Sequence, residues 1–104
     1  MGNPFAGEVT IGVDGVERPM KLTLGALAEL EESLGADSLV GLVERFEGGR
    51  ISSRDVLALI VAGLRGGGWR VSRDELLAAE IAGGPVAAAR AAGELIARAF
   101  ALPE

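Results

Sequence analysis

Ile51-Ser-Ser-Arg-Asp-Val-Leu-Ala-Leu-Ile-Val-Ala-Gly-Leu-Arg-Gly-Gly-Gly68 is the stretch of sequence around which the rest of the chain is organised. Its nine residues from Val56 to Leu64 carry no polar side chain, which predicts a helix that is apolar on every side. Such a helix must be covered on every side, so we expect the rest of the chain to wrap it. Any part left uncovered would form a groove for another apolar segment.

The residues that flank the apolar run predict where this helix begins and ends. Ser52 or Ser53 can cap its N-terminus, and Asp55 places a carboxylate in the first turn, where the helix dipole favours an anion. Arg65 and the glycines at 66–68 close the helix. We interpret these glycines as a helix stop and flexible connector, because the Lys-Ser or Lys-Thr of a phosphate-binding loop does not follow them.

Upstream of this helix, residues 8–13 and 16–24 flank Asp14-Gly15, which predicts a β-hairpin because both turn positions tolerate positive φ. The apolar residues expected on one face are Val9, Ile11 and Val13 in the first arm and Met20, Leu22 and Leu24 in the second. Pro19 cannot donate a hydrogen bond, which marks a sheet edge or a strand break. A lone hairpin is marginal in water, so its apolar face should pack on helices.

Two amphipathic helices are predicted between the hairpin and the apolar run. Thr23 caps the first and Gly35 stops it, whereas Asp37 or Ser38 caps the second and the glycines at 48–49 end it. The apolar residues at helical spacing are Leu24, Leu27, Leu30 and Leu34 in the first helix and Leu39, Leu42, Val43 and Phe46 in the second.

Two more helices are predicted after the apolar run. Ser72 with Glu75 three residues later matches a capping box, and the helix that it begins extends through Ile81 to the glycines at 83–84. Pro85 suits the first turn of a fifth helix, because the donor that it lacks would be unpaired there. The stripe expected along the fifth helix consists of Val86, Ala89, Gly93, Ile96 and Phe100, flanked by Leu95, Ala99 and Leu102.

Together these patterns predict one α+β domain over residues 1–104, with an N-terminal β-hairpin within 1–22 packed on four to five α-helices within 23–104. Hydrophobic residues make up 49% of the chain, which is enough for one modest aliphatic core. The longest apolar run is far shorter than the roughly 20 residues that span a bilayer. We therefore expect a cytoplasmic protein that does not enter the membrane.

The net charge of −5 is spread unevenly. Residues 23–50 hold six carboxylates against two arginines, whereas residues 51–70 hold three arginines against one aspartate. We do not expect nucleic acid as a partner, because no cluster of cations is present. Catalysis and cofactor or metal binding are not expected either, since His, Cys and Tyr are absent and we interpret Glu29, Glu31 and Glu32 as a solvated helix face.

The residues predicted to bind a partner lie on the apolar run and just beyond it. Trp69 stands among glycine and polar residues, so it is either a plug for the helix bundle or an anchor for a partner. The hypothesis places the binding surface on the exposed part of the run together with this Trp. Its members are Val56, Leu57, Ile60, Val61, Leu64 and Trp69.

Five sequence blocks occur in order along the chain. They are Asn3-Pro-Phe-Ala-Gly-Glu-Val9, Leu22-Thr-Leu-Gly-Ala-Leu-Ala-Glu-Leu-Glu31, Leu42-Val-Glu-Arg-Phe46, Val56-Leu-Ala-Leu-Ile-Val-Ala-Gly-Leu-Arg65 and Ser72-Arg-Asp-Glu75. With the Ala-rich end, they resemble the small tail-assembly proteins of gene transfer agents and related tailed phages, a family described both as tail assembly chaperones and as tail tube proteins. The resemblance implies a chaperone that coats apolar helical stretches of the tape-measure protein, with the tail tube protein as a second candidate partner and no catalytic residues.

Three alternatives stay open at this point. A structural tail component would remain in the finished particle. A small helix-turn-helix regulator, built from the third and fourth helices, would bind DNA in a salt-dependent way. An enzyme would need a carboxylate pair that the sequence does not display. The oligomeric state is also open, and a homo-oligomer is compatible with every one of these interpretations.

Overall fold

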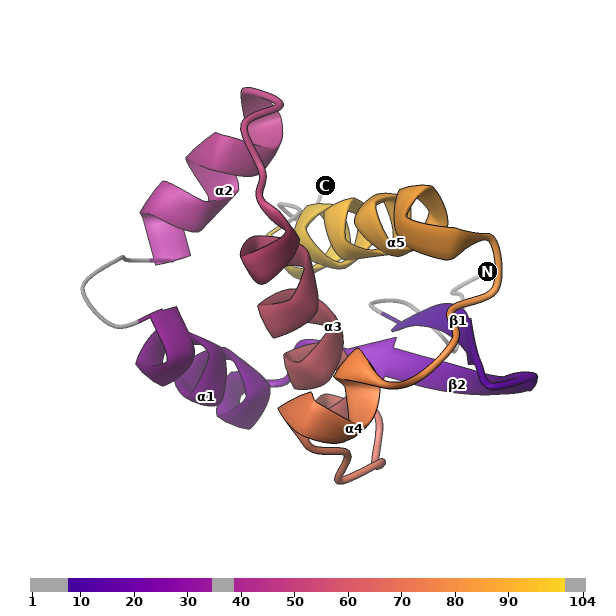
Figure 1. The fold of residues 1–104 in the computed structure, drawn as a ribbon. Coiled ribbons are helices and arrows are strands. Elements are labelled where there is room, and N and C mark those ends of the chain that lie inside the picture. Colours follow the sequence, from indigo (N-terminus) through magenta and orange to yellow (C-terminus); the bar gives the residue numbers. More distant parts are fainter. Residues whose placement is uncertain (1–7, 35–38, 101–104) are drawn as a thin grey trace, which may run out of the picture.

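The computed structural model describes residues 8–34 and 39–100, and it confirms the α+β class. Two antiparallel strands, β1 (Glu8–Val13) and β2 (Val16–Lys21), precede the helices of the described chain. The helices are α1 (Leu24–Leu34), α2 (Leu39–Glu47), α3 (Ser53–Gly66), α4 (Arg73–Leu77) and α5 (Gly84–Ala99). Figure 1 shows α3 in the centre, with α1 and α2 on one side and the hairpin, α4 and α5 on the other.

The hairpin turns at the predicted position. Asp14 and Gly15 have φ values of 51° and 82°, the pair of left-handed conformations that a two-residue turn needs to match the twist of its strands. The register pairs Val9 with Met20, and both side chains are buried, as predicted. One face of the hairpin therefore belongs to the hydrophobic core.

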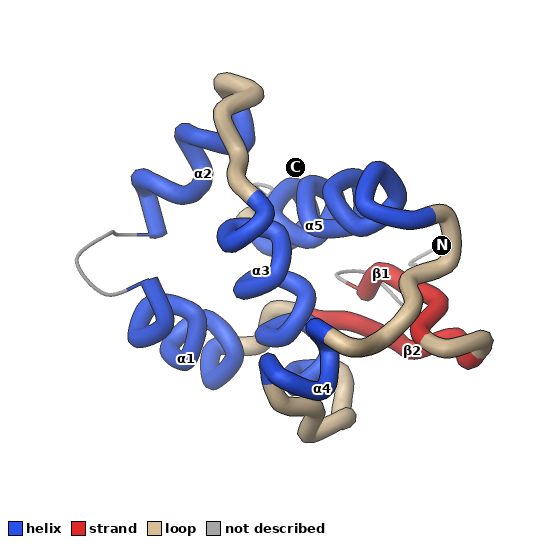
Figure 2. The backbone as a smooth tube through the Cα atoms, viewed as in Figure 1, coloured by secondary structure: helices blue, strands red, loops and turns tan. Residues whose placement is uncertain are grey.

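The outer edge of β1 is paired near the turn by the segment that follows α4 (Figure 2). Ala82 donates its backbone N–H to the carbonyl oxygen of Gly12 over 2.9 Å, and Val13 and Ile81 form an antiparallel bridge. The fourth helix therefore ends at Leu77, and its predicted extension through Ile81 is wrong. Pairing with β1 satisfies backbone groups that further helical turns would have used.

The outer edge of β2 is covered by the C-terminal turn of α3. A Cβ atom added at Gly66 would overlap the carbonyl of Lys21, and one at Gly67 would overlap the carbonyl of Pro19. Gly67 has a φ of −83°, which any residue adopts, so the fold needs the missing side chain rather than an unusual backbone. The prediction that these glycines form a flexible connector is wrong here, because they are packing positions.

α3 is the central helix, as the apolar run predicted. Its N-cap is Ser52, whose hydroxyl oxygen accepts the N–H of Asp55 over 3.1 Å while the Asp55 carboxylate accepts the N–H of Ser52 over 3.2 Å. Leu59, Ile60 and Leu64 are at most 2% exposed. The hairpin, α1 and α5 supply most of the cover around them.

The predicted stripe of α1 is wrong at Leu24, which is 84% exposed. Thr23 caps the helix as predicted, with its hydroxyl oxygen accepting the N–H of Ala26 over 3.1 Å. Because the helix starts directly after this cap, its first residue points to solvent, and Ala26 and Leu30 face the core instead.

In α2, Leu42 is buried as predicted. Gly35, Asp37, Ser38 and Leu102, which were assigned to helix ends and a flanking stripe, lie outside the described residues.

The predicted stripe of α5 is rotated relative to the observed one. Val86 and Phe100 are 67% and 44% exposed. The residues of α5 that face the core are Ala88, Ala91, Ala92, Leu95 and Ile96. This Ala-rich helix carries small side chains on several of its own faces. Its packing against α3 and the hairpin therefore selects the buried face, and its own periodicity does not.

Candidate functional site

An apolar groove of about 520 Å³ lies between α3, α4 and α5. One wall is formed by Val56, Leu57 and Ile60 of α3. The other lining residues are Ile51, Ser52, Ser53, Arg54, Arg73, Leu76, Leu77, Ile81, Pro85, Ala88 and Ala89. Apart from the serines and arginines at its border, the groove offers a partner only apolar side chains.

The short helix α4 positions the rim of the apolar groove. Its capping box holds the first turn, since the Ser72 hydroxyl oxygen accepts the N–H of Glu75 over 3.1 Å and the Glu75 carboxylate accepts the N–H of Ser72 over 2.9 Å. Leu76 anchors the helix in the core and is 6% exposed, whereas the adjacent Leu77 is 60% exposed. One turn of helix thus presents a leucine to solvent at the edge of the groove.

A second, arginine-rich groove of about 640 Å³ lies across α3 from the first, between α1, α3 and the segment after α2. Its charged lining residues are Glu29, Arg45, Arg50, Arg54, Asp55, Arg65 and Arg73. Ser52, Arg54 and Arg73 line both grooves, so the two hollows share a border.

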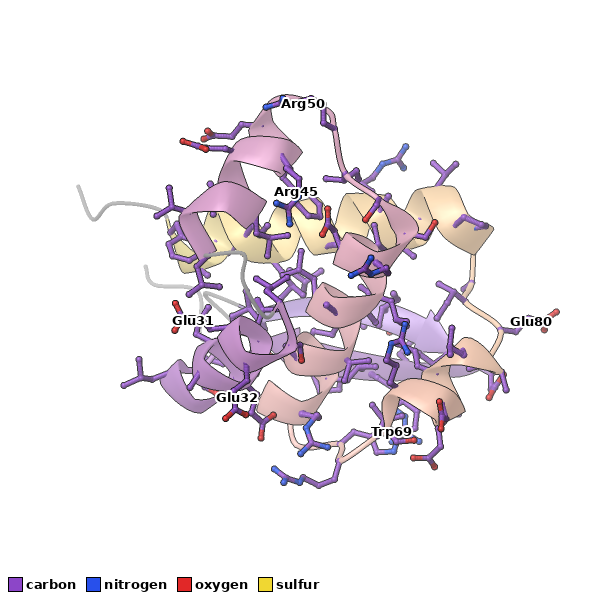
Figure 3. All side chains as sticks on the ribbon, turned by 60° about the vertical axis from the view of Figure 1, so that its left-hand side comes forward. Glu31, Glu32, Arg45, Arg50, Trp69 and Glu80 are labelled. Atoms are coloured by element: carbon purple, nitrogen blue, oxygen red, sulfur yellow. The ribbon has the colours of Figure 1, made fainter. Side chains whose placement is uncertain are left out.

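Asp55 is the one buried charged residue in the described part of the chain, at 7% exposure. Arg45 holds it through two hydrogen bonds, from Nε to Oδ2 and from Nη2 to Oδ1, each 2.9 Å long. The Arg45 hydrogen bonds lower the pKa of Asp55 more than its burial raises it. Figure 3 shows Arg45 between α2 and α3, so this ion pair fastens α2 to the central helix. The carboxylate is therefore charged at neutral pH and committed to a structural contact.

Glu29, from the predicted acidic face, pairs with Arg65 over 2.9 Å. The hydrogen bond from Arg65 lowers the pKa of Glu29, and the same contact raises the pKa of Arg65.

Glu31 and Glu32, the other two carboxylates of the predicted acidic face, point to solvent from α1 (Figure 3). Within residues 8–34 and 39–100, no group of three or more His, Cys, Asp or Glu side chains is arranged to hold a metal ion.

The six residues predicted to bind a partner do not form one surface. Val56, Leu57 and Ile60 line the apolar groove, although Ile60 is only 2% exposed. Val61 lines the arginine-rich groove on the other side of α3. Leu64 is 0% exposed in the core, which corrects its predicted position on an exposed surface.

Trp69, the sixth of these residues, is half-buried and packs against the core. The guanidinium carbon of Arg18 lies 4.1 Å from the centre of a Trp69 ring, in the geometry of a cation–π contact. The ring is therefore covered on one face by the protein itself. This arrangement favours the plug interpretation over the anchor interpretation, and Figure 3 shows the side chain at the end of the molecule next to α4.

Sequence reasoning missed the part of the apolar groove contributed by α4 and α5, and it missed the two border arginines. A signal for the arginines is present, because the triplet Ser-Arg-Asp occurs both at 53–55 and at 72–74. Each triplet begins a helix that borders the groove. No comparable signal marks the contribution of α5, because its groove residues are alanines and a proline that lie far along the chain.

These observations define the class of protein: it is a small α+β protein that carries an apolar groove beside an arginine-rich groove. The chain belongs to the family described as phage tail tube protein, GTA-gp10, whose sequence model matches residues 6–102. No curated protein and no solved structure is detectably similar to it. The family confirms the tail-related part of the resemblance seen in the sequence. No helix among the described residues is long and apolar enough to cross a membrane.

Proposed function

We propose that this chain is a tail assembly chaperone, which holds an apolar helical segment of the tape-measure protein in the apolar groove until the tail tube forms. Membership of a tail protein family supports the pathway. The observation that carries the finer proposal is the groove between α3, α4 and α5, because its walls are apolar and lie open to solvent. A groove of this kind accepts the apolar face of a helix.

The gain on binding comes from apolar surface that the free protein leaves in water. Leu77 is 60% exposed, and Val56 and Leu57 are only half-buried. Covering such surface contributes about 25 cal/mol for each Å² removed from water. The groove is small, so each contact is weak and reversible. Weak contacts suit a chaperone, which has to release its client when tube subunits take its place.

The family description itself favours a second candidate, a tube component that stays in the particle. Subunits that join through their sheets need free strand edges. Here the C-terminal turn of α3 covers the carbonyls of Pro19 and Lys21 on β2, and residues 80–82 pair with β1 near the turn. The small sheet, whose two edges are each partly covered, supports the chaperone over the tube component. Mass spectrometry of purified particles distinguishes the two, since a chaperone is absent from them.

The binding proposal is tested by capturing the tape-measure protein with two matched variants. Leu77→Ser removes an exposed leucine at the rim of the apolar groove, and Leu24→Ser removes an 84% exposed leucine outside both grooves. We expect Leu77→Ser to weaken capture about tenfold, as the loss of one large apolar contact does, and Leu24→Ser to bind like the wild type. Equal capture by all three proteins would contradict the proposal.

A further inference from the structure

Three arginines of the arginine-rich groove have no ion-pair partner among the residues that the structure describes. Both carboxylates that line this groove are already paired, Asp55 with Arg45 and Glu29 with Arg65. Arg50, Arg54 and Arg73, in contrast, form no ion pair with any residue of 8–34 or 39–100. Within the described part of a chain whose net charge is −5, three cations around one hollow thus stay unpaired.

Two of these arginines occupy positions that stability does not explain. Arg54 lies in the first turn of α3 and Arg73 is the first residue of α4. The dipole of a helix disfavours a cation at this end, so both residues add positive charge where the backbone is already positive. Each of them also lines both grooves. The positive charge is therefore placed along the border of the apolar groove.

We propose that the segment held in the apolar groove is an amphipathic helix with acidic side chains along one edge, and that those carboxylates pair with Arg54 and Arg73. This inference rests on the proposed function, because it describes the client of the same groove. The apolar face of the client helix lies on Val56, Leu57 and Leu77, and its acidic edge faces the shared border. Arginine pairs with carboxylates through two parallel hydrogen bonds, so this contact also fixes the orientation of the client.

The surroundings favour a protein helix over nucleic acid as the source of the negative charge. The apolar groove directly adjoins the cations, and it offers no matching surface to a phosphate backbone. The overall charge of −5 repels a polyanion, whereas a short acidic edge meets only the local arginines. Arg50 also lines the arginine-rich groove and is not one of the residues shared with the apolar groove, so it extends the positive surface beyond the border.

The test uses the full chain and two synthetic helical peptides of about 18 residues, long enough for five turns. Both peptides carry the same Leu and Ala stripe; one has Glu along a single edge and the other has Gln at the same positions. Binding is measured by fluorescence anisotropy at about 50 mM and about 500 mM NaCl, since salt screens exposed charge pairs. We expect the Glu peptide to bind about fivefold more tightly at low salt, with the preference lost at high salt.

Two double variants assign the preference to the border. Arg54→Gln with Arg73→Gln should bind both peptides equally, as the wild type binds the Gln peptide. Arg90→Gln with Arg98→Gln removes the same charge from α5, outside both grooves, and should keep the preference. Thermal melts monitored by circular dichroism check that each variant is folded.

The outcomes separate this inference from the proposed function. If the wild type binds both peptides equally while Leu77→Ser weakens both, the groove holds apolar helices but the acidic edge is wrong. If neither peptide binds and the tape-measure protein is not captured, the proposed function fails together with the inference. A DNA duplex that displaces the Glu peptide at low salt, or self-association that only the Arg54 and Arg73 variant abolishes, would overturn the inference in favour of another occupant.

Discussion

Neither end of the apolar run at 56–64 carries a polar side chain, yet the two ends lie in different surroundings in the fold. Val56, Leu57 and Ala58 are half-buried and lie beside the grooves. Ala62, Gly63 and Leu64 are buried, and Gly63 approaches Met20 and Leu95 so closely that a Cβ atom would crowd them. Hydrophobicity therefore does not separate core from binding surface. What separates them is which neighbours the rest of the chain places alongside.

The largest effect on stability is expected where the C-terminal turn of α3 packs against β2. Gly66→Ala places a methyl group onto the carbonyl of Lys21, and neither backbone can move without disrupting the core. We expect a loss of more than about 4 kcal/mol in the free energy of unfolding, measured by urea denaturation.

The matched control is Gly25→Ala in the first turn of α1, where an added Cβ would meet only the Thr23 hydroxyl oxygen at 3.9 Å. Alanine has the higher helix propensity, so this variant should gain about 0.5–1 kcal/mol. Similar stability changes in the two variants would show that α3 does not pack closely against β2.

The second-largest effect on stability is expected from a Leu→Ala substitution, made separately near the two ends of the apolar run at 56–64. Leu64→Ala should lower the free energy of unfolding by about 3 kcal/mol, because Leu64 is 0% exposed and leaves a cavity. Leu57→Ala, at a half-buried position beside the apolar groove, should lower it by about 1 kcal/mol. Denaturant titration of both variants measures the difference, and equal losses would remove the contrast between the two ends.

A smaller effect on stability is expected at Asp55, which links the N-terminal turn of α3 to α2 through its ion pair with Arg45. Asp55→Asn loses the charged partner of Arg45, and we expect a loss of about 2 kcal/mol at pH 7. The pKa of Asp55 is lowered in the folded state, so its contribution is complete above the ordinary value of about 4 and is lost as the pH falls through the lowered pKa. Unfolding curves of wild type and variant should therefore converge under acidic conditions.

Glu75→Gln is the control for this comparison, because Glu75 occupies the same position of the second capping box. Its carboxylate is exposed and has no arginine partner in the described chain, so the loss should be smaller than for Asp55→Asn. If the two variants lose equal stability, the capping box and not the Arg45 ion pair accounts for the role of Asp55.

The smallest effect on stability is expected at the rim of the apolar groove. Leu77→Ser alters a residue that is 60% exposed, so the midpoint of thermal unfolding should stay within a few degrees of the wild-type value. The same variant is the one expected to weaken client capture. A large drop in the midpoint would mean that Leu77 belongs to the core in solution.

Local signals in the sequence were sufficient for most element boundaries. The Asp14-Gly15 turn, the Thr23 cap and the Ser72 capping box were all predicted, because each depends on residues that are neighbours in the chain. Predictions failed where distant segments compete for the same backbone or face. The length of α4 depends on pairing with β1, and the buried face of α5 depends on its packing against α3.

The candidate site was predicted only in part for the same reason. Val56, Leu57 and Ile60 were identified from hydrophobicity, and they do line a groove. The opposite wall comes from α4 and α5, and no pattern within 51–68 indicates which residues those helices will present. Trp69 was predicted to be a plug or a partner anchor because of its residue type and its polar neighbours in sequence. In the structure it packs against the core, and Arg18 covers one face of its ring.

The sequence by itself determined the α+β class, the hairpin turn, the helix caps and the central place of the apolar run, since these follow from backbone preferences and from the need to bury a helix without a polar face. Only the tertiary structure decided that Gly63 and Leu64 at the end of that run are buried and that Val56 and Leu57 at its start stay half-buried in a groove bordered by Arg54 and Arg73. The physical reason is that burial depends on the distance between segments. Chain-neighbour preferences place no constraint on that distance, whereas close contacts such as those of Gly66 and Gly67 with β2 fix it.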